Sequence, residues 1–172
     1  MFLPRDKQLR KLNLLLFSVC VLLYMLGFCF SRQSKAAETF NDRTDKLCLN
    51  EVCSRNFSVL QSEDGDYYDY IELYNPTEKE LSLEGYSLFR SSDDKKKFVF
   101  GRRTIAAKGY VLVYASGADE TDGSEYAGFK ISNSGECLFL ADADGTLIDS
   151  VEIPSGMKHD TSYARSEDGV GE

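Results

Sequence analysis

The chain has 172 residues with 20 Lys and Arg against 28 Asp and Glu, so its net charge is −8. This length accommodates one domain and an appended segment. The negative charge repels polyanions and argues against nucleic acid as a partner. With a single histidine, His159, and no Cys-x-x-Cys pair, the sequence lacks the ligand spacing of a zinc site.

The first 30 residues have the pattern of a membrane segment. Residues 1–11 hold four basic side chains, and the uncharged run at 12–30 has 19 residues, enough to cross a hydrocarbon core of ~30 Å as a helix. The positive-inside rule places the N-terminus in the cytoplasm and the rest of the chain outside. The run exceeds the apolar core of a typical signal peptide, which favours an uncleaved anchor. A signal peptide cleaved near residues 34–36 is the alternative, and it would give a secreted domain.

A polar linker at 31–46 follows the apolar run. Beyond residue 30 the chain holds 16 of the basic and 27 of the acidic side chains, a net charge of −11. Such a charge keeps an exported domain soluble. We expect the folded domain at 47–165 and a disordered tail, rich in Gly, Asp and Glu, at 166–172.

The clearest strand signal lies in residues 65–76, where a Gly/Asp turn leads into an alternating segment that ends at an Asn-Pro turn. Ile71 and Leu73 should point to the core. Three larger aromatic or charged residues should point to the opposite face: Tyr70, Glu72 and Tyr74.

The same rhythm of short apolar segments and Gly/Asp turns continues along the domain, and no amphipathic helix interrupts it. Short, evenly spaced strands of this kind predict an all-β sandwich or barrel. The expected strands are 47–53, 69–74, 81–83, 85–90, 98–100, 109–115, 136–142, 146–153 and 161–165.

The cysteines divide into two groups. Cys20 and Cys29 fall in the apolar run, while Cys48, Cys53 and Cys137 belong to the domain. Three thiols allow at most one disulfide within the domain. Because Cys48 and Cys53 have opposite parity on one expected strand, they should face opposite sides and not pair with each other. Cys137 could meet either one across a sheet, and the sequence leaves the redox state of all three open.

In order and spacing, these segments resemble the bacterial lamin tail domain. The matching stretches are 50–52, 65–76, 83–88, 105–113, 129–136, 142–145, 148–151 and 162–165. The resemblance implies an immunoglobulin-like β-sandwich over about 47–165 and a scaffold or adhesion role, and it supplies no catalytic residues. In bacteria such a domain commonly precedes a second module, often a CotH kinase-like domain.

Two groups of residues invite a catalytic or metal-binding interpretation. Asp64, Asp66 and Asp69 precede one strand, but Asp and Gly are also what turns require, and the spacing is not that of an EF-hand. His159 stands beside Asp160, yet no nucleophile elbow accompanies it. The sequence therefore predicts no catalytic residues, no metal and no cofactor.

The remaining hypothesis is recognition by a rigid scaffold. The outward residues Tyr70, Glu72 and Tyr74 are the candidate binding residues, because tyrosines on a sheet face suit stacking on a glycan or a peptide. The loops at 54–66, 91–97 and 116–128 would complete the contact surface. Lys95, Lys96 and Lys97, with Arg90, are interpreted as a solvated loop.

The sequence thus predicts a non-enzymatic, membrane-anchored, extracytoplasmic binding or scaffold module whose partner is an unidentified protein or glycan of the cell envelope. The alternative is a targeting module for a CotH-like kinase or another enzyme. Its catalytic domain would then lie outside this sequence or on another chain.

Overall fold

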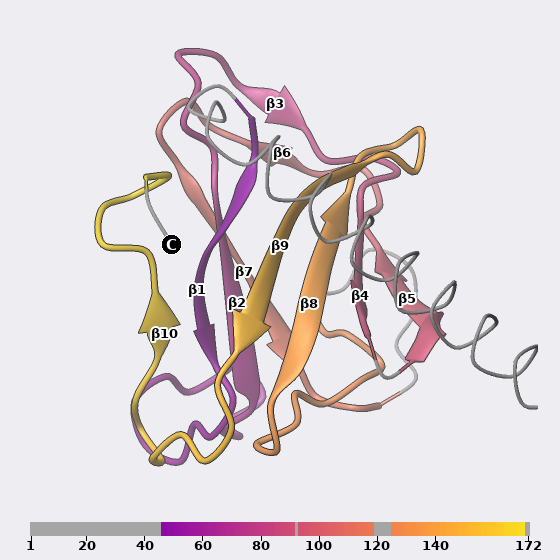
Figure 1. Cartoon of the computed structure of the whole chain (residues 1–172). Coiled ribbons are helices and arrows are strands. Elements are labelled where there is room, and N and C mark those ends of the chain that lie inside the picture. Colours follow the sequence, from indigo (N-terminus) through magenta and orange to yellow (C-terminus); the bar gives the residue numbers. More distant parts are fainter. Residues whose placement is uncertain (1–45, 92, 119–124, 171–172) are drawn as a thin grey trace, which may run out of the picture. The chain divides into compact units, whose positions relative to one another are not determined.

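The computed structural model describes residues 46–91, 93–118 and 125–170, all within the compact unit Thr44–Glu172. Over these residues the fold is all-β and contains no helix. Two four-stranded antiparallel sheets pack face to face, and a small two-stranded sheet lies at one end (Figure 1). The expected all-β sandwich is confirmed.

The first large sheet, called sheet I, has the strand order β10-β1-β2-β7, and the second, sheet II, has the order β5-β4-β8-β9. The small sheet pairs β3 with β6. The strands are β1 Cys48–Cys53, β2 Asp69–Tyr74, β3 Leu81–Ser82, β4 Ser87–Arg90, β5 Asp93–Val99, β6 Thr104–Ile105, β7 Tyr110–Ala115, β8 Glu136–Ala141, β9 Leu147–Ile153 and β10 Tyr163–Ala164.

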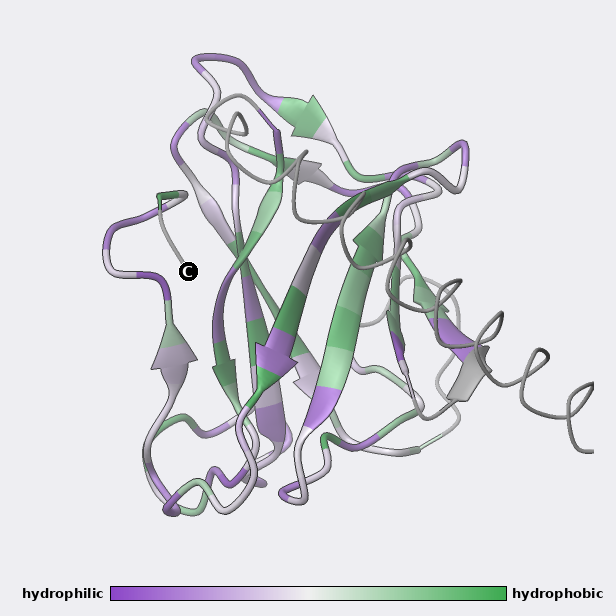
Figure 2. Ribbon diagram, viewed as in Figure 1, coloured by the Kyte–Doolittle hydropathy of each residue, from purple (hydrophilic) through white to green (hydrophobic). Residues whose placement is uncertain are grey.

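The core lies between the two sheets and is built by alternation along the strands. Ile71 and Leu73 of β2 are fully buried, as expected, and their partners on β7 are Val113 and Val111. Sheet II contributes a similar set of inward side chains, with β8 coloured as an almost continuously hydrophobic strand in Figure 2. Burial of this apolar surface, at roughly 25 cal/mol per Å², is the main force that holds the sheets together.

A β-bulge interrupts the pairing of β1 with β2 between Leu49 and Glu51, so that Asn50 is the extra residue. Before the bulge Cys48 faces Tyr74, and after it Cys53 faces Tyr70. Since directly opposed residues of a sheet share a face, both cysteines lie on the side that points away from the core.

The prediction that Cys48 and Cys53 face opposite sides is therefore wrong, because the bulge shifts the parity of the strand by one residue. Both thiols are buried and free, and Cys137, on β8 of the other sheet, is free as well. The pairing of Cys137 with either of them, which the sequence left open, is not formed in the structure.

Sheet II corrects another expectation. The lysine-rich segment 91–97, expected as a loop, supplies most of β5, which pairs with β4 on one side only. Lysines are common on edge strands, where they discourage pairing with other chains. Arg90 does not join them: its Nη1 donates to the Lys130 carbonyl at 2.8 Å and lies 3.7 Å from a carboxylate oxygen of Glu136.

The segment 129–131, which leads to β8, is not a strand, yet Phe129 and Ile131 are buried in the core. Arg90 contacts this segment: its guanidinium lies over the Phe129 ring at 5.3 Å, and its Nη1 donates to the backbone carbonyl of Lys130.

The expected membrane span at 12–30 lies outside the described residues. Within the ranges that the structure describes, no helix is long and apolar enough to cross a membrane.

Candidate functional site

The candidate site is the outer face of sheet I, the side of β1, β2 and β7 that points away from the core. Register arranges this face in three rows across the strands, and the sequence-predicted residues form its central column. The rows are Cys53–Tyr70–Tyr114, Glu51–Glu72–Leu112 and Cys48–Tyr74–Tyr110.

Tyr70 is packed into this face and is only 6% exposed. Its hydroxyl donates a hydrogen bond of 2.6 Å to Oε1 of Glu51. Burial, followed by this bond to a carboxylate, raises the pKa of Tyr70 well above its usual range. Tyr70 therefore stays neutral and anchors β2 to β1, and it offers little free surface.

The residues that follow β10 cover part of this face near the row Cys48–Tyr74–Tyr110. We call residues 165–170 the strap. Asn50, the bulge residue, holds it: the backbone N–H of Arg165 donates to the Asn50 carbonyl at 2.9 Å, and that of Gly169 donates to Asn50 Oδ1 at 3.2 Å. The Asn50 amide nitrogen donates to Oδ1 of Asp168 and to Oε1 of Glu72, both at 2.9 Å.

Residues 166–170 of the strap belong to the tail that the sequence predicted to be disordered, and in the structure they make specific hydrogen bonds to the sheet. Composition predicted disorder because Gly, Asp and Glu contribute little to a core. Order comes instead from hydrogen bonds, to which Tyr110 adds by donating from its hydroxyl to Oδ2 of Asp168. Gly169 has φ +71°, and a Cβ at this position would lie 3.2 Å from ring atoms of Tyr74. The strap thus rests directly on Tyr74.

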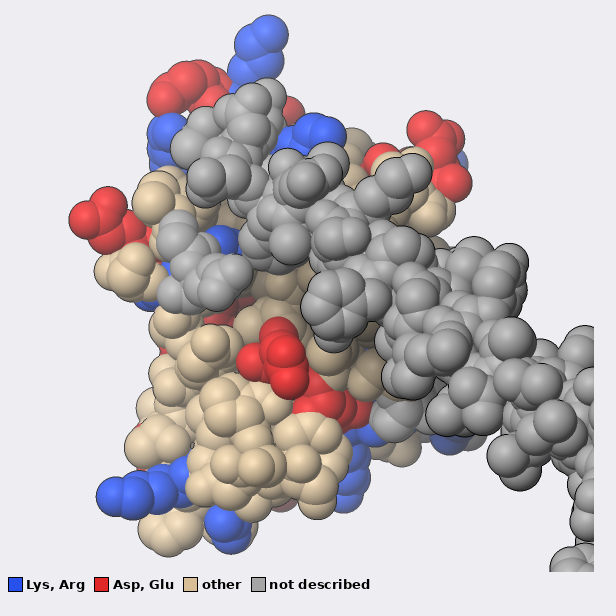
Figure 3. Space-filling model, viewed as in Figure 1, with Lys and Arg blue, Asp and Glu red and all other residues tan. Residues whose placement is uncertain are grey.

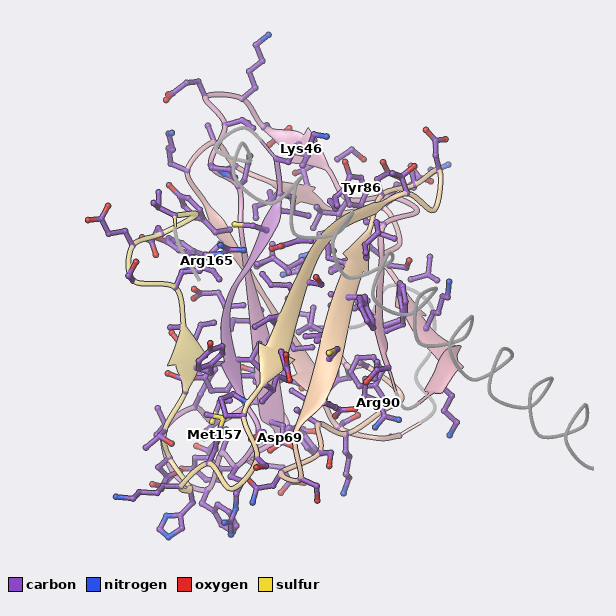
Figure 4. All side chains as sticks on the ribbon, in the orientation of Figure 1. Lys46, Asp69, Tyr86, Arg90, Met157 and Arg165 are labelled. Carbon is purple, nitrogen blue, oxygen red and sulfur yellow. The ribbon has the colours of Figure 1, made fainter. Side chains whose placement is uncertain are left out.

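A buried ion pair fixes the start of the strap to the body of the sandwich. Asp149 of β9 is 1% exposed, and its Oδ2 accepts from Nη2 of Arg165 at 2.9 Å and from the backbone N–H of Leu49 at 2.8 Å. Arg165 also donates from Nε to the Leu49 carbonyl at 2.8 Å. Figure 4 shows Arg165 beside β1, between β10 and the body of the domain. One charge pair therefore joins both sheets and the strap.

The carboxylates of this face have opposite electrostatic environments. Burial raises the pKa of Glu72, although the hydrogen bond from Asn50 opposes the shift. Hydrogen bonds from Tyr110 and Asn50 hold the pKa of Asp168 below its usual range. The carboxylates of Glu72 and Asp168 both accept a hydrogen bond from the side-chain amide nitrogen of Asn50. This shared donor links the strap to the sheet.

Next to the strap the face stays open. Tyr110 is 48% exposed, and Glu72 and Leu112 are partly exposed. Farther along, Tyr126 stacks on Tyr114 with ring centroids 5.4 Å apart. This surface combines aromatic rings with a carboxylate, which is the chemistry of stacking and hydrogen bonding to a ligand.

Tyr68 extends the aromatic row at the end of the face. Its ring meets Tyr126 edge-on at 5.8 Å, and its hydroxyl donates to Asp64 at 3.0 Å and to Asp66 at 3.2 Å. The bond to Asp64 is the main reason that its pKa rises to about 12. Asp64 also accepts from Ser62 and from the Asp66 backbone, so these acids build the turn.

In the described residues, the geometry supports neither the hydrolytic nor the metal-binding interpretation. Oδ2 of Asp160 accepts from the Ser58 hydroxyl at 2.8 Å, while Nδ1 of His159 lies 4.0 Å from the same oxygen, so serine contacts the acid and not the histidine. In the part of the chain that the structure describes, no three His, Cys, Asp or Glu residues are grouped to hold a metal ion.

The sequence analysis did not identify two residues that hold the strap, Asn50 and Asp168. A polar Asn in the middle of an apolar strand segment was the available signal, since Asn is unfavourable in regular strands and suits a bulge. Asp168 gave no such signal because its role depends on a residue 118 positions away.

The fold is an all-β sandwich, and one of its sheets has a partly exposed outer face with aromatic and acidic side chains. The family model of the Lamin Tail Domain matches residues 42–155, and the chain belongs to this family. The family is non-catalytic and immunoglobulin-like, in agreement with the resemblance seen in the sequence. No curated protein matches the chain.

Proposed function

We propose that this protein is a non-enzymatic binding or scaffold module held at the cell envelope, and that the open part of the outer face of sheet I is its contact surface. The observation that carries the proposal is the row Glu72–Leu112 with Tyr110 beside it, where an aromatic ring, an apolar side chain and a carboxylate are partly exposed together. The partner class is an envelope protein or glycan.

The sequence-predicted residues divide the work within this surface. Tyr70 and Tyr74 are buried supports, held by Glu51 and by the strap. Glu72 is the accessible one of the three and supplies a hydrogen-bond acceptor. A surface whose side chains are fixed before binding loses less conformational entropy on association.

The membrane anchor is the second part of the proposal. It is supported by the basic residues 1–11 and the uncharged run 12–30, a pattern that by the positive-inside rule favours a cytoplasmic N-terminus and an extracytoplasmic domain. In the alternative, the domain positions an enzyme such as a CotH-like kinase. The same outer face would then contact the enzyme or its target.

Co-sedimentation of the full chain with isolated bacterial cell walls tests the contact surface. Tyr110→Ala and Glu72→Gln should each weaken binding about tenfold or more, because truncating a central contact has effects of that size. Val99→Ala is the matched control, since Val99 is 55% exposed but lies on β5 of sheet II. Equal binding by all three variants and the native chain would refute this assignment of the surface.

A further inference from the structure

A second exposed surface lies at the end of the sandwich where β1 finishes. Residues 55–60, which we call the tip, carry Phe57 and Val59, each 59% exposed and the most exposed large apolar residues in the described ranges. Two such side chains side by side on one short loop are more than the scattered apolar exposure of an ordinary surface.

Two polar side chains fix the shape of the tip. Oδ1 of Asn56 accepts the backbone N–H groups of Val59 and Leu60, both at 3.1 Å. Oδ1 of Asp160 accepts the N–H groups of Phe57, at 2.7 Å, and Ser58, at 3.0 Å. All four consecutive N–H groups from residue 57 to residue 60 are therefore bonded inside the protein.

Asp160 adopts an unfavourable backbone conformation to make these bonds, since its φ of +59° is rare for residues other than Gly. Its own N–H donates to the Arg55 carbonyl at 2.8 Å, which ties the tip to the segment before β10. The result of this hydrogen bonding is a rigid loop that directs Phe57 and Val59 outward.

Basic groups surround the apolar pair. The Arg55 guanidinium lies over the Phe57 ring at 5.7 Å, and the ring of His159 meets Phe57 edge-on at the same separation. Lys158 is exposed next to His159. In Figure 3 the lower end of the domain is formed largely by uncharged residues with Lys and Arg atoms at its margin. Arg55 and Lys158 bring positive charge to the tip, beside the Asp160 carboxylate that bonds its backbone, whereas the whole chain has a net charge of −8.

The tip also lies far from the start of the domain. β1 leads from Lys46 toward it, and Figure 4 places Lys46 and Met157 at opposite ends of the sandwich. The tip is thus distinct from the outer face of sheet I and from the point where the chain enters the domain.

We propose that the tip docks onto an anionic lipid surface, with Phe57 and Val59 entering the boundary between headgroups and acyl chains and Arg55 and Lys158 meeting lipid phosphates. Apolar side chains with a basic rim are the composition that binds such a surface. In an apolar environment a backbone N–H without a hydrogen-bond partner is energetically costly. The N–H groups of residues 57–60 are all bonded within the protein, so the tip avoids this cost.

The absence of tryptophan from the chain gives a direct test. Phe57→Trp in the full chain places a single emitter at the tip, and Leu147→Trp places one at a comparably exposed position, 45%, where β9 begins. Each variant is reconstituted into vesicles of phosphatidylcholine alone or mixed with phosphatidylglycerol, with brominated acyl chains as quenchers. The N-terminal run is present in both, so its insertion cancels in the comparison.

We expect the emission of the Phe57→Trp variant to shift to the blue and to be quenched in the phosphatidylglycerol vesicles only, while the emission of the Leu147→Trp variant is unaffected in both. Arg55→Glu with Lys158→Glu on the Phe57→Trp background should weaken the contact by more than about tenfold, since each basic residue near an anionic surface contributes roughly fivefold. Val59→Trp should repeat the result if Phe57→Trp folds poorly.

Three outcomes would overturn the proposal. If the tryptophan stays unquenched in every vesicle, in both the Phe57→Trp and the Val59→Trp variants, the tip does not contact lipid. A macromolecular partner would then be the occupant of the tip. Equal quenching with and without phosphatidylglycerol would remove the role of charge. Equal quenching at positions 57 and 147 would mean that the whole domain lies on lipid. None of these bears on cell-wall binding by Tyr110 and Glu72, because the tip does not depend on the outer face.

Discussion

The strap and the tip are built by the same device with opposite results. In each, one asparagine bonds the backbone of a short loop: Asn50 holds Gly169, and Asn56 holds Val59 and Leu60. At the strap this bonding covers Tyr74, which is only 9% exposed, whereas at the tip it leaves Val59 59% exposed. Hydrogen bonds between a buried asparagine side chain and the loop backbone fix the position of each loop. The side chains of the loop then determine whether it covers the domain or projects from it.

The largest effect should come from the ion pair that holds the start of the strap. Asp149→Ala leaves the Arg165 charge and the Leu49 N–H without their principal partner in the interior, and we expect a loss of about 3–5 kcal/mol in the free energy of unfolding. Urea denaturation measures it. Glu84→Ala is the matched control because its ion pair with Arg102 is exposed, and it should change stability by less than about 1 kcal/mol. Similar losses for both variants would show that the buried pair has no special role.

Removing each asparagine tests the comparison itself. Asn50→Ala and Asn56→Ala should each lower the free energy of unfolding by about 2 kcal/mol, because buried donors and acceptors lose their partners. Hydrogen exchange should then separate the two loops. Asn50→Ala should release the Gly169 amide and leave Val59 and Leu60 protected, and Asn56→Ala should do the reverse. Loss of protection at both loops in either variant would mean that strap and tip are coupled.

The sequence predicted the regular parts of the fold because alternation is a local property. Ile71 and Leu73 point inward and Tyr70 and Tyr74 outward, as the pattern required. The bulge at Asn50 was missed, although a polar Asn within an apolar strand segment was a signal for it, and one inserted residue shifts the parity of the strand.

The parts that the sequence missed depend on contacts between distant residues. The lysines of residues 91–97 led to the prediction of a loop, whereas β5 forms because it pairs with β4. The Gly, Asp and Glu content of the tail led to the prediction of disorder, whereas the strap is held by hydrogen bonds from Asn50 and Tyr110. The sequence predicted residues 54–66 to form a polar loop. It did not predict the exposure of Phe57, because the backbone of Phe57 is held by a hydrogen bond to the distant Asp160.

The smallest predicted effect is a pH dependence of the strap. The folded-state pKa of Asp168 lies below its ordinary value of 3.8, so its contribution to stability is complete above that value and is lost as the pH falls through the lower, folded-state pKa. Glu72 acts in the opposite sense: its pKa is raised above 4.5, so protonation as the pH falls through the raised value favours the folded state. Thermal unfolding of the native chain and of Asp168→Asn should therefore differ most above pH 3.8 and converge as the pH falls through the lower, folded-state pKa of Asp168. A difference that persists at the lowest pH would show that the charge of Asp168 does not hold the strap, and would leave Asn50 and the packing of Gly169 on Tyr74 to hold it.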